Sequence, residues 1–225
     1  MQPIRVWITP PGPNPWKFIF VLEELGIPYE VKSIKFDDVK KKPLTDVNPN
    51  GRVPAIEDPN HAGGLTLWES GAILTYLVEQ YDPDHTLTYT DLADRHHLNQ
   101  WLQFQMSGQG PYYGAAAWFV NLHPEKVLTA IDCYTNQVTR VLDVLEGWLA
   151  AKGEGGKRHK FDGFPHVKAW HNRMIERPAW KRSMKLRARL MDEQGLQWNG
   201  IPKGITSFAE YEDLIKAGQD TGAKE

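Results

Sequence analysis

A proline inside an otherwise strand-like run constrains this chain more than any other feature. Residues 52–56 read Arg-Val-Pro-Ala-Ile, and an apolar run of this kind is typical of a β-strand. Pro54 has no amide hydrogen to donate to a sheet, so it must lie at a strand start, an edge or a cis bend. A cis bond before Pro54 turns the amide and the carbonyl of Val53 outward, where a ligand can reach them.

A hairpin and a helix are expected directly after this proline. A turn rich in Asp, Pro, Asn and Gly spans residues 58–64, and residues 65–68 form a second strand-like run, which predicts an antiparallel pair. Glu69 and Ser70 then precede an apolar pattern with helical spacing. Ser70 is therefore expected near a helix N-terminus, where a hydroxyl and free backbone amides attract an anion. Glu69 supplies the complementary acid for an amine.

A ligand with a carboxylate, an amine and an extended peptide backbone fits these groups, and glutathione is such a ligand. The strings NPNGRVPA (residues 48–55) and LTLWESGAIL (residues 65–74) resemble the glutathione-binding signature of the glutathione transferase superfamily. They are most similar to the fungal transferases related to the yeast nitrogen-regulator prion protein. The resemblance implies an α+β thioredoxin-like N-terminal domain, an all-α helical C-terminal domain and a homodimer.

The N-terminal patterns agree with a thioredoxin-like domain over residues 1–82. Residues 4–8 alternate as a strand that stops at a Pro-rich turn. Asn14 is a favoured N-cap residue, and apolar residues then recur at helical spacing until Gly26. Residues 27–36 alternate again, which predicts a strand, helix, strand unit with parallel pairing before the hairpin and the final helix.

Only helical patterns follow a polar linker at residues 83–90, so an all-helical domain with the electrophile site is expected over residues 91–225. One long helix is predicted from Leu92 to Gly108, and Gly110-Pro111 is expected to break it. Pro124 is expected to open another long helix, whose continuous apolar face extends to Leu149.

One segment of the helical domain, residues 150–164, departs from the family's pattern. In the family, a core helix opened by a Gly-Asp-x-x-Thr-x-Ala-Asp motif lies between the preceding long helix and the FPHVKAW segment. Here the segment is rich in Gly and Lys and has little apolar area to bury. Either residues are unrecorded or a core helix is absent, which would expose apolar surface. In the next helix, Val167, Trp170 and Met174 are expected to point inward.

Composition argues against several kinds of partner. A net charge of -2 over 225 residues argues against an electrostatic grip on nucleic acid or on an acidic membrane. The single cysteine, Cys133, suits a reducing compartment. We expect a cytoplasmic protein, since no run approaches the length of a membrane span and the N-terminus lacks a signal-peptide core. No metal is predicted, because the histidines lack the spacing of a helical zinc pair.

Glutathione transfer requires a thiolate near neutral pH, whereas a free thiol has a pKa of roughly 8.5. Family classes that use Tyr, Ser or Cys to favour the thiolate place it near the start of the first helix, and residues 9–17 contain none of these. Asn14 matches the asparagine of the yeast protein's relatives, and its amide can donate a hydrogen bond to sulfur. An amide cannot act as a general base, so Asn14 would stabilise the thiolate or would only cap the helix. Thr9 is the alternative donor.

The resemblance implies a contact for each part of glutathione. The Val53 backbone is expected to pair with the cysteinyl backbone, Glu69 with the γ-glutamyl amine, and Ser70 with the γ-glutamyl carboxylate. Residues 40–42 are all lysine and lie where the family often places a base for the glycyl carboxylate. We assign this contact to Lys41, although three adjacent lysines are also typical of a solvated loop.

The electrophile site is expected to have apolar walls, because broad hydrophobic acceptors need few polar groups. The residues expected to line it are Trp16, Gln105, Gln109, Tyr112, Tyr113 and Trp118. An aromatic cluster at helical spacing is also typical of a core, and the Tyr112 and Tyr113 pair fits either role.

These features together predict a glutathione transferase that conjugates the thiolate to a hydrophobic electrophile, for detoxification or in a biosynthetic pathway. Two alternatives remain open. One is a glutathione-binding regulator with little transferase activity. The other is a glutathione-dependent thiol oxidoreductase or peroxidase, for which Cys133 lies in the helical domain rather than at the predicted site.

Overall fold

The protein is described by a computed structural model, which covers residues 1–151, 163–206, 210 and 213. The described residues group into two compact units. The first unit combines residues 1–99 with residues 178–203, and the second contains residues 100–177. Residues 178–203 thus group with the N-terminal strands, while the domain division expected at the linker of residues 83–90 remains a prediction.

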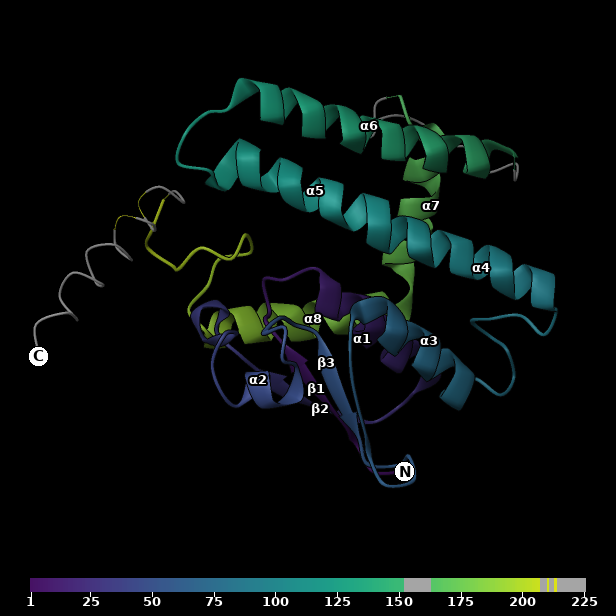
Figure 1. Cartoon of the computed structure of the whole chain (residues 1–225). Coiled ribbons are helices and arrows are strands. Elements are labelled where there is room, and N and C mark those ends of the chain that lie inside the picture. Colours follow the sequence, from purple (N-terminus) through teal and green to yellow (C-terminus); the bar gives the residue numbers. More distant parts are fainter. Residues whose placement is uncertain (152–162, 207–209, 211–212, 214–225) are drawn as a thin grey trace, which may run out of the picture. The chain divides into compact units, whose positions relative to one another are not determined.

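The first unit contains a four-stranded sheet in the order β2-β1-β3-β4 (Figure 1). Its strands are β1 (Ile4–Ile8), β2 (Tyr29–Ser33), β3 (Ala55–Asp58) and β4 (Leu65–Trp68). β1 pairs in parallel with β2, and the pairs β1 with β3 and β3 with β4 are antiparallel. The expected parallel unit and the following antiparallel hairpin are both confirmed.

The helical segments of this unit are α1 (Asn14–Leu25), η1 (Phe36–Asp38), α2 (Leu44–Val47), α3 (Ser70–Tyr81) and α8 (Pro178–Glu193). α1 ends at Gly26 as expected, where φ is 65° and glycine adopts the left-handed conformation without a Cβ penalty. At its other end the N-cap position is held by Pro13. Asn14 is therefore the first helical residue and does not cap the helix.

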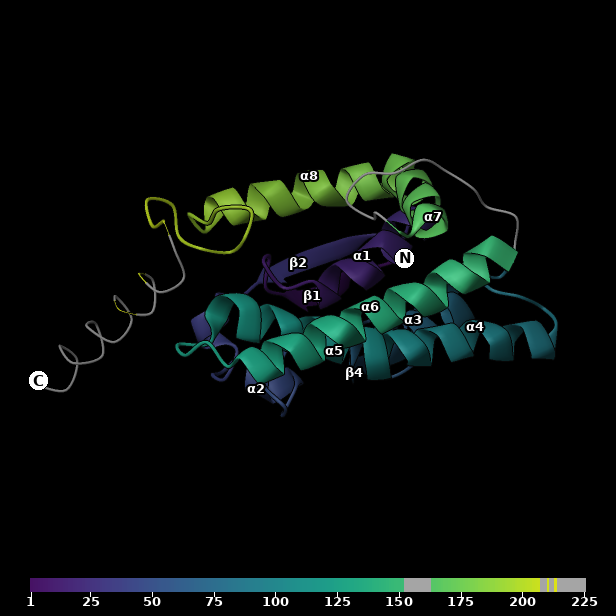
Figure 2. The same cartoon turned by 90° about the horizontal axis from the view of Figure 1, so that it is seen from above.

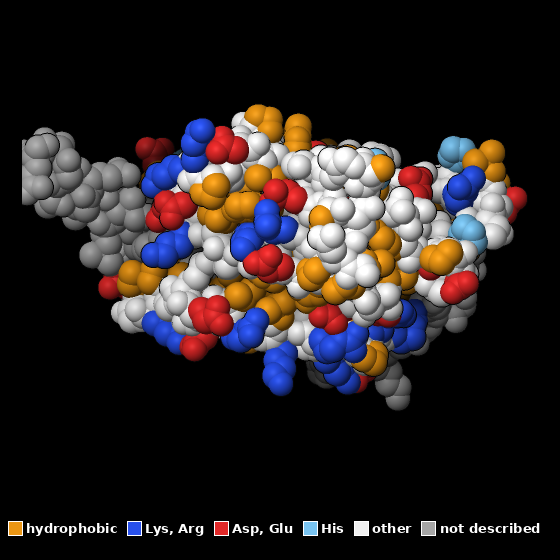
Figure 3. Space-filling view, turned by 90° about the horizontal axis from the view of Figure 1, so that it is seen from below, with side chains coloured by type: hydrophobic (Ala, Val, Ile, Leu, Met, Phe, Trp, Pro, Cys, Tyr) orange, Lys and Arg blue, Asp and Glu red, His pale blue; other side chains and the backbone are white. Residues whose placement is uncertain are grey.

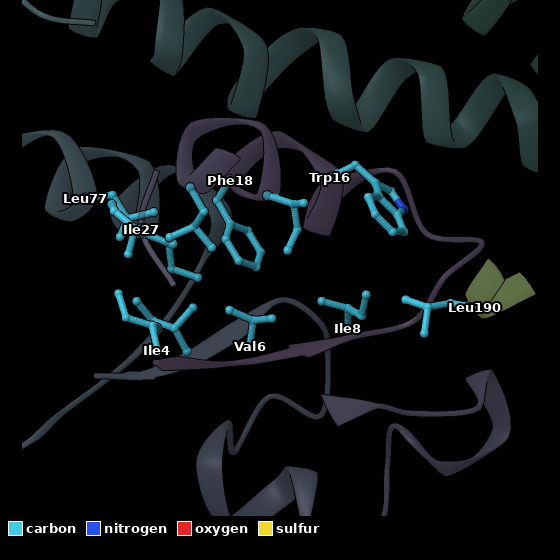
Figure 4. Packing of buried hydrophobic residues seen from close by; sticks show 12 residues of the cluster. Ile4, Val6, Ile8, Trp16, Phe18, Ile27, Leu77 and Leu190 are labelled. Atoms are coloured by element: carbon cyan, nitrogen blue, oxygen red, sulfur yellow. The ribbon is translucent and has the colours of Figure 1, made fainter. Parts of the chain in front are cut away.

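A continuous apolar core lies between one face of the sheet and α1. Ile4, Val6 and Ile8 of β1 point toward Phe18 and Trp16 of α1 (Figure 4). Residues of α3 and α8 complete this cluster. The alternation expected for β1 is confirmed, because all of its even-numbered residues are fully buried.

The opposite face of the sheet has a smaller cluster covered by α2. Trp7 of β1, Ala55 of β3 and Leu44 of α2 are its buried members. The Trp7 indole N–H donates a hydrogen bond to Glu57 at 2.6 Å. Both faces of β1 are therefore covered. The turn after β1 and the loop before β3 extend from this packed sheet.

α8 packs against α1 within the same unit (Figure 2). The rings of Phe20 and Trp180 stack with centroids 4.6 Å apart, and Arg182 donates hydrogen bonds to the side chain and the carbonyl oxygen of Glu23. This contact joins residues that are far apart in the sequence, and it explains why residues 178–203 belong to the sheet unit.

The second unit is helical. Beyond the end of α4 (Leu92–Phe104), its elements are η2 (Gln105–Gln109), α5 (Gly110–Ala117), η3 (Trp118–Leu122), α6 (Leu128–Ala151) and α7 (Pro165–Glu176). α5 and α6 lie side by side (Figure 1).

The break expected at Gly110-Pro111 is wrong. The chain stays helical through these residues because η2 is a π-helical turn, in which the Gly110 N–H bonds to the carbonyl oxygen of Gln105. The wider turn accommodates a proline ring that would clash in a regular α-helix.

The helical unit buries few of its apolar side chains. Among its described residues the buried hydrophobic side chains are Val141, Leu149 and Val167. Trp148 and Trp170 are 41% and 39% exposed, so the expectation that Trp170 points inward is wrong. The segment predicted to lack a core helix falls mainly on residues 152–162, outside the described residues.

A carboxylate joins the last two helices of this unit. Glu146 of α6 accepts hydrogen bonds from the backbone N–H groups of His166 at 3.0 Å and Val167 at 2.8 Å, and its side chain lies 2.5 Å from the His166 ring. Burial opposes the charged form, but these hydrogen bonds hold the pKa of Glu146 below its usual value. Glu146 therefore supplies the N-terminal cap that α7 lacks in its own sequence.

The described residues were searched for membrane-spanning helices and for clusters of metal-binding side chains. None of the described helices is long and apolar enough to cross a bilayer. The described part of the chain contains no group of three or more potential metal-binding side chains. Acidic and basic side chains are interspersed on the face shown in Figure 3.

Candidate functional site

The loop before β3 presents an unpaired peptide group. The Val53-Pro54 bond is cis and β3 begins at Ala55, so the expected position of Pro54 is confirmed. Among the described residues, the N–H and the carbonyl of Val53 have no hydrogen-bond partner. Asn48, which is 2% exposed, holds the loop by donating to the Arg52 carbonyl at 2.7 Å. The loop is thus fixed while the Val53 peptide groups stay available.

The N-terminus of α3 lies next to this loop. The register pairs Ala55 with Trp68, so Val53, two residues before β3, and Ser70, two residues after β4, lie beyond the same end of this strand pair. α3 begins at Ser70, as expected. Glu69 precedes it with φ at 73°, a conformation that is uncommon for a residue with a side chain and is often found at functional sites.

Several donors at the start of α3 have no partner. The first bond of the helix runs from the Ile73 N–H to the Glu69 carbonyl at 3.0 Å, and the preceding N–H groups have no bonding partner among the described residues. The Ser70 hydroxyl likewise makes no hydrogen bond within the described chain, although the residue is only 6% exposed. A hydroxyl and free amides at a helix N-terminus form a site suited to a carboxylate.

Lys17 is a charged residue affected by Glu69 that the sequence did not indicate. It lies in α1, which packs against α3. Burial lowers the pKa of Lys17 to about 8, and the negative charge of Glu69 partly opposes this effect. The two side chains therefore interact across α1 and α3. No local pattern indicated this pair, because it depends on how the two helices pack.

The turn before α1 distinguishes the two candidate sulfur donors. Asn14 is exposed, and its side chain has no hydrogen-bond partner among the described residues. Thr9 is 2% exposed, and a Cβ added to Gly12 would lie 2.9 Å from the Thr9 hydroxyl oxygen. The turn thus covers Thr9 and leaves the Asn14 amide accessible beside the helix N-terminus.

The three lysines differ in their contacts. Lys40 donates to the Asn50 carbonyl at 2.8 Å, and a Cβ at Gly51 would lie 2.9 Å from its side chain. Lys41 pairs with Asp38 at 2.9 Å and Lys42 pairs with Asp46 at 3.1 Å. Lys40 is therefore the lysine held against the loop that leads to Val53. The assignment of the glycyl contact to Lys41 remains a prediction.

The residues expected to line the electrophile site fall into both units. Trp16 is 4% exposed in the sheet core, and its indole N–H donates to the Pro10 carbonyl at 3.0 Å. It offers little surface to an acceptor. The other members lie in the helical unit: Gln105 and Gln109 in η2, Tyr112 under Arg140 at 5.6 Å, Tyr113 with its pKa raised by burial, and Trp118 at 45% exposure. Their role as acceptor walls remains a prediction.

The sheet order, the cis-proline loop before β3 and the helix that begins at Ser70 together define a thioredoxin-like domain, and the comparison with known proteins identifies its family. The glutathione S-transferase N-terminal domain profile matches residues 2–79. The glutathione S-transferase-like protein gedE of Aspergillus terreus is 42% identical over 216 residues, covering 81% of this chain and 94% of that protein. The chain therefore belongs to the glutathione S-transferase family, and the expected resemblance and fold class are confirmed.

Two further relatives show the range of the family. The structure of the glutathione transferase URE2P6 from Phanerochaete chrysosporium, in complex with oxidized glutathione, is 38% identical with a TM-score of 0.76, and the match covers 83% of this chain and 97% of that one. The transcriptional regulator URE2 of Saccharomyces cerevisiae is 40% identical over 148 residues, covering 64% of this chain and 42% of that protein. Family membership alone therefore does not distinguish an enzyme from a regulator.

The relatives also bear on chain length. The match to gedE extends over 216 positions, whereas 81% of 225 residues is about 182. About 34 positions of the alignment therefore pair a residue of gedE with a gap in this chain.

Proposed function

We propose that this protein binds glutathione and conjugates its thiolate to a hydrophobic electrophile. One observation supports the proposal: among the described residues, the Val53 peptide has no hydrogen-bond partner, and it lies beyond the same end of the β3–β4 pair as the start of α3. In this arrangement the cysteinyl backbone pairs with Val53, and the γ-glutamyl carboxylate accepts hydrogen bonds from Ser70. The γ-glutamyl amine then pairs with Glu69.

Calorimetry with glutathione tests the binding site. We expect Ser70→Ala and Glu69→Ala each to weaken binding by about 1.5 to 3 kcal/mol, as for a lost hydrogen bond to a charged group. Thr66→Ala, on the exposed side of β4, is the matched control and should bind as the wild type does. A wild type that does not bind glutathione, or a Ser70→Ala variant with unchanged affinity, would refute the site.

The proposed sulfur chemistry rests on Asn14. Its unpaired amide and the N-terminus of α1 both favour a bound thiolate. Asn14→Ala should raise the thiol pKa of bound glutathione by about one to two units, while affinity stays nearly unchanged because the other contacts remain. The ultraviolet thiolate band and the rate with an aryl halide should follow the same titration. If the variant titrates like the wild type, a backbone amide of residues 12–16 or Thr9 is the donor.

A glutathione-binding regulator is the second candidate, and the similarity to URE2 favours it. A wild type that binds glutathione but shows neither the thiolate band nor conjugation would support it. A thiol oxidoreductase or peroxidase is the third, and the oxidized glutathione bound to URE2P6 favours it. The single cysteine, Cys133, is exposed in α6, so disulfide reduction that survives Cys133→Ser would mean turnover by glutathione alone.

We further propose a homodimer in the cytoplasm, with Arg52 and residues 92–108 at the interface. Arg52 is exposed in the described chain, which is compatible with a contact to a second copy. Light scattering at micromolar concentration should give twice the mass of one chain. A strictly monomeric species would contradict the proposal and is the expected result if an absent helix weakens the helical unit.

A further inference from the structure

A short hairpin after α8 carries an unusually exposed aromatic side chain. Leu196 bridges with Pro202, and the hairpin is closed by backbone hydrogen bonds from Gln197 to Ile201 and from Lys203 to Gly195, both at 2.7 Å. Trp198 at its tip is 81% exposed, more than any other large hydrophobic side chain among the described residues. A single exposed aromatic side chain is common on protein surfaces, so the meaning of Trp198 depends on what surrounds the hairpin.

The hairpin is anchored to the sheet unit rather than mobile at its base. Ile201 is 3% exposed, and Arg187 of α8 donates a hydrogen bond to the Trp198 carbonyl at 3.0 Å. An ion pair joins Lys203 to Asp192 of α8. These contacts fix the backbone of Trp198 while its ring remains accessible, so a ligand that stacks on the ring meets a preorganised surface.

The tip of the hairpin contacts the turn that leads into α1. Gly200 has a φ of 91°, and a Cβ added there would lie 2.9 Å from the Cβ of Pro11. No side chain fits at that position. Pro11 and Asn14 are three residues apart, so their Cα atoms are separated by at most about 11 Å. The hairpin therefore lies beside the turn at which the glutathione sulfur is proposed to bind.

We propose that Trp198 is a specificity-determining residue that forms one wall of the electrophile site and favours aromatic acceptors. The proposal rests on the proposed function, since it places the acceptor at a sulfur held near Asn14. An acceptor joined to that sulfur extends from the same turn that the hairpin contacts, and the indole offers it a planar face for offset stacking. Trp16, the tryptophan expected in this role, is buried in the core.

The test compares three ligands whose glutathione part is the same. Calorimetry of the full chain is carried out with glutathione, S-hexylglutathione and S-(p-nitrobenzyl)glutathione. Trp198→Ala should lower the affinity for the nitrobenzyl ligand about three- to tenfold, the size of an aromatic stacking contact. It should leave the affinity for glutathione within about twofold of the wild-type value. The affinity for the hexyl ligand should fall less than that for the nitrobenzyl ligand, because an alkyl chain cannot stack on the indole ring. Trp198→Phe should retain most of the nitrobenzyl affinity.

Tyr89→Ala is the matched control, because Tyr89 is an aromatic residue of the same unit that is 51% exposed. It should bind all three ligands as the wild type does. Unchanged nitrobenzyl affinity in Trp198→Ala, or an equal loss for all three ligands, overturns the role of Trp198 while glutathione binding keeps the proposed function intact. A change of oligomeric state in Trp198→Ala without a selective loss overturns it in favour of a contact between copies. A wild type that binds none of the ligands overturns both proposals.

Discussion

The two units of this protein bury their apolar residues very differently. In α1 of the sheet unit, Phe18, Ile19 and Leu22 are fully buried. α6 of the helical unit has an equally continuous apolar stripe in its sequence, yet Val141 and Leu149 are its only buried members among the described residues. The contrast shows that an amphipathic stripe specifies a face to be covered, while burial depends on another element that covers it.

The proposed glutathione site lies in the unit that buries its apolar residues more completely. The residues proposed to hold glutathione, Val53, Glu69, Ser70 and Asn14, all lie in the sheet unit. A well-packed scaffold can hold such a site in place. Glutathione binding should therefore tolerate substitutions in the helical unit.

The largest expected difference concerns two leucines on helices. Leu22→Ala removes a fully buried side chain from the sheet core and should lower the free energy of unfolding by about 2 to 5 kcal/mol. Leu128 of α6 is 67% exposed, so Leu128→Ala should change stability by less than about 0.5 kcal/mol. Urea unfolding of both variants is the measurement. Equal losses would mean that the helical unit has a core that covers Leu128.

The second difference concerns one carboxylate in each unit. Asp58, 1% exposed, accepts hydrogen bonds from the hydroxyls of Tyr76 and Tyr81 and from Asn60. Burial opposes the charge, but these bonds hold the pKa of Asp58 below its usual value. Asp58→Asn should cost about 2 to 3 kcal/mol, because an amide leaves some of these donors unpaired. Glu146→Gln should cost about 1 kcal/mol, as for a lost helix cap.

Acid titration distinguishes the two carboxylates from ordinary ones. A lowered folded pKa stabilises the protein above the unfolded pKa, and this stability is lost as pH falls through the folded value. The loss should begin near pH 4, the unfolded range of Asp and Glu, and should be smaller in each variant than in the wild type. Parallel acid profiles of variant and wild type would argue against the pKa shift.

Lys17 should affect stability by a smaller amount that depends on pH. Its folded pKa is about 8, below the ordinary value of 10.5, so the unfolded state binds more protons between these values. Stability should therefore rise with pH across this window. Lys17→Met should be more stable than the wild type at pH 7 by about 1 kcal/mol, allowing for screening by solvent. This advantage should disappear by about pH 10.5, and a difference that is independent of pH would contradict the assignment.

The smallest effect is expected for the lysines at the loop before β3. Lys40→Ala should weaken glutathione binding by less than about 1 kcal/mol, because the contact is exposed to solvent. Lys42→Ala, which removes the ion pair with Asp46, is the control. Calorimetry that finds the loss in Lys41→Ala instead would support the assignment of the glycyl contact to Lys41.

The parts of the site that sequence predicted are those determined by local chemistry. Pro54 could be assigned to a strand start or a cis bend because proline lacks an amide hydrogen. Ser70 could be assigned to a helix start because an apolar helical pattern follows it. The strand pairing was predictable for the same reason, since alternation and turn residues lie within one short segment.

Other features of the site depend on contacts between segments that are distant in sequence, and local patterns could not predict them. Trp16 and Trp198 are equally apolar in sequence, yet packing of α1 on the sheet buries the first and the hairpin after α8 exposes the second. The effect of the Glu69 charge on Lys17 requires α1 to lie against α3, and the contact of Gly200 with Pro11 requires the chain after α8 to return to the turn before α1. Local patterns specify backbone geometry and apolar faces. The choice of which faces meet is made by the packing of the whole chain, because burial is a property of the surface that two elements share.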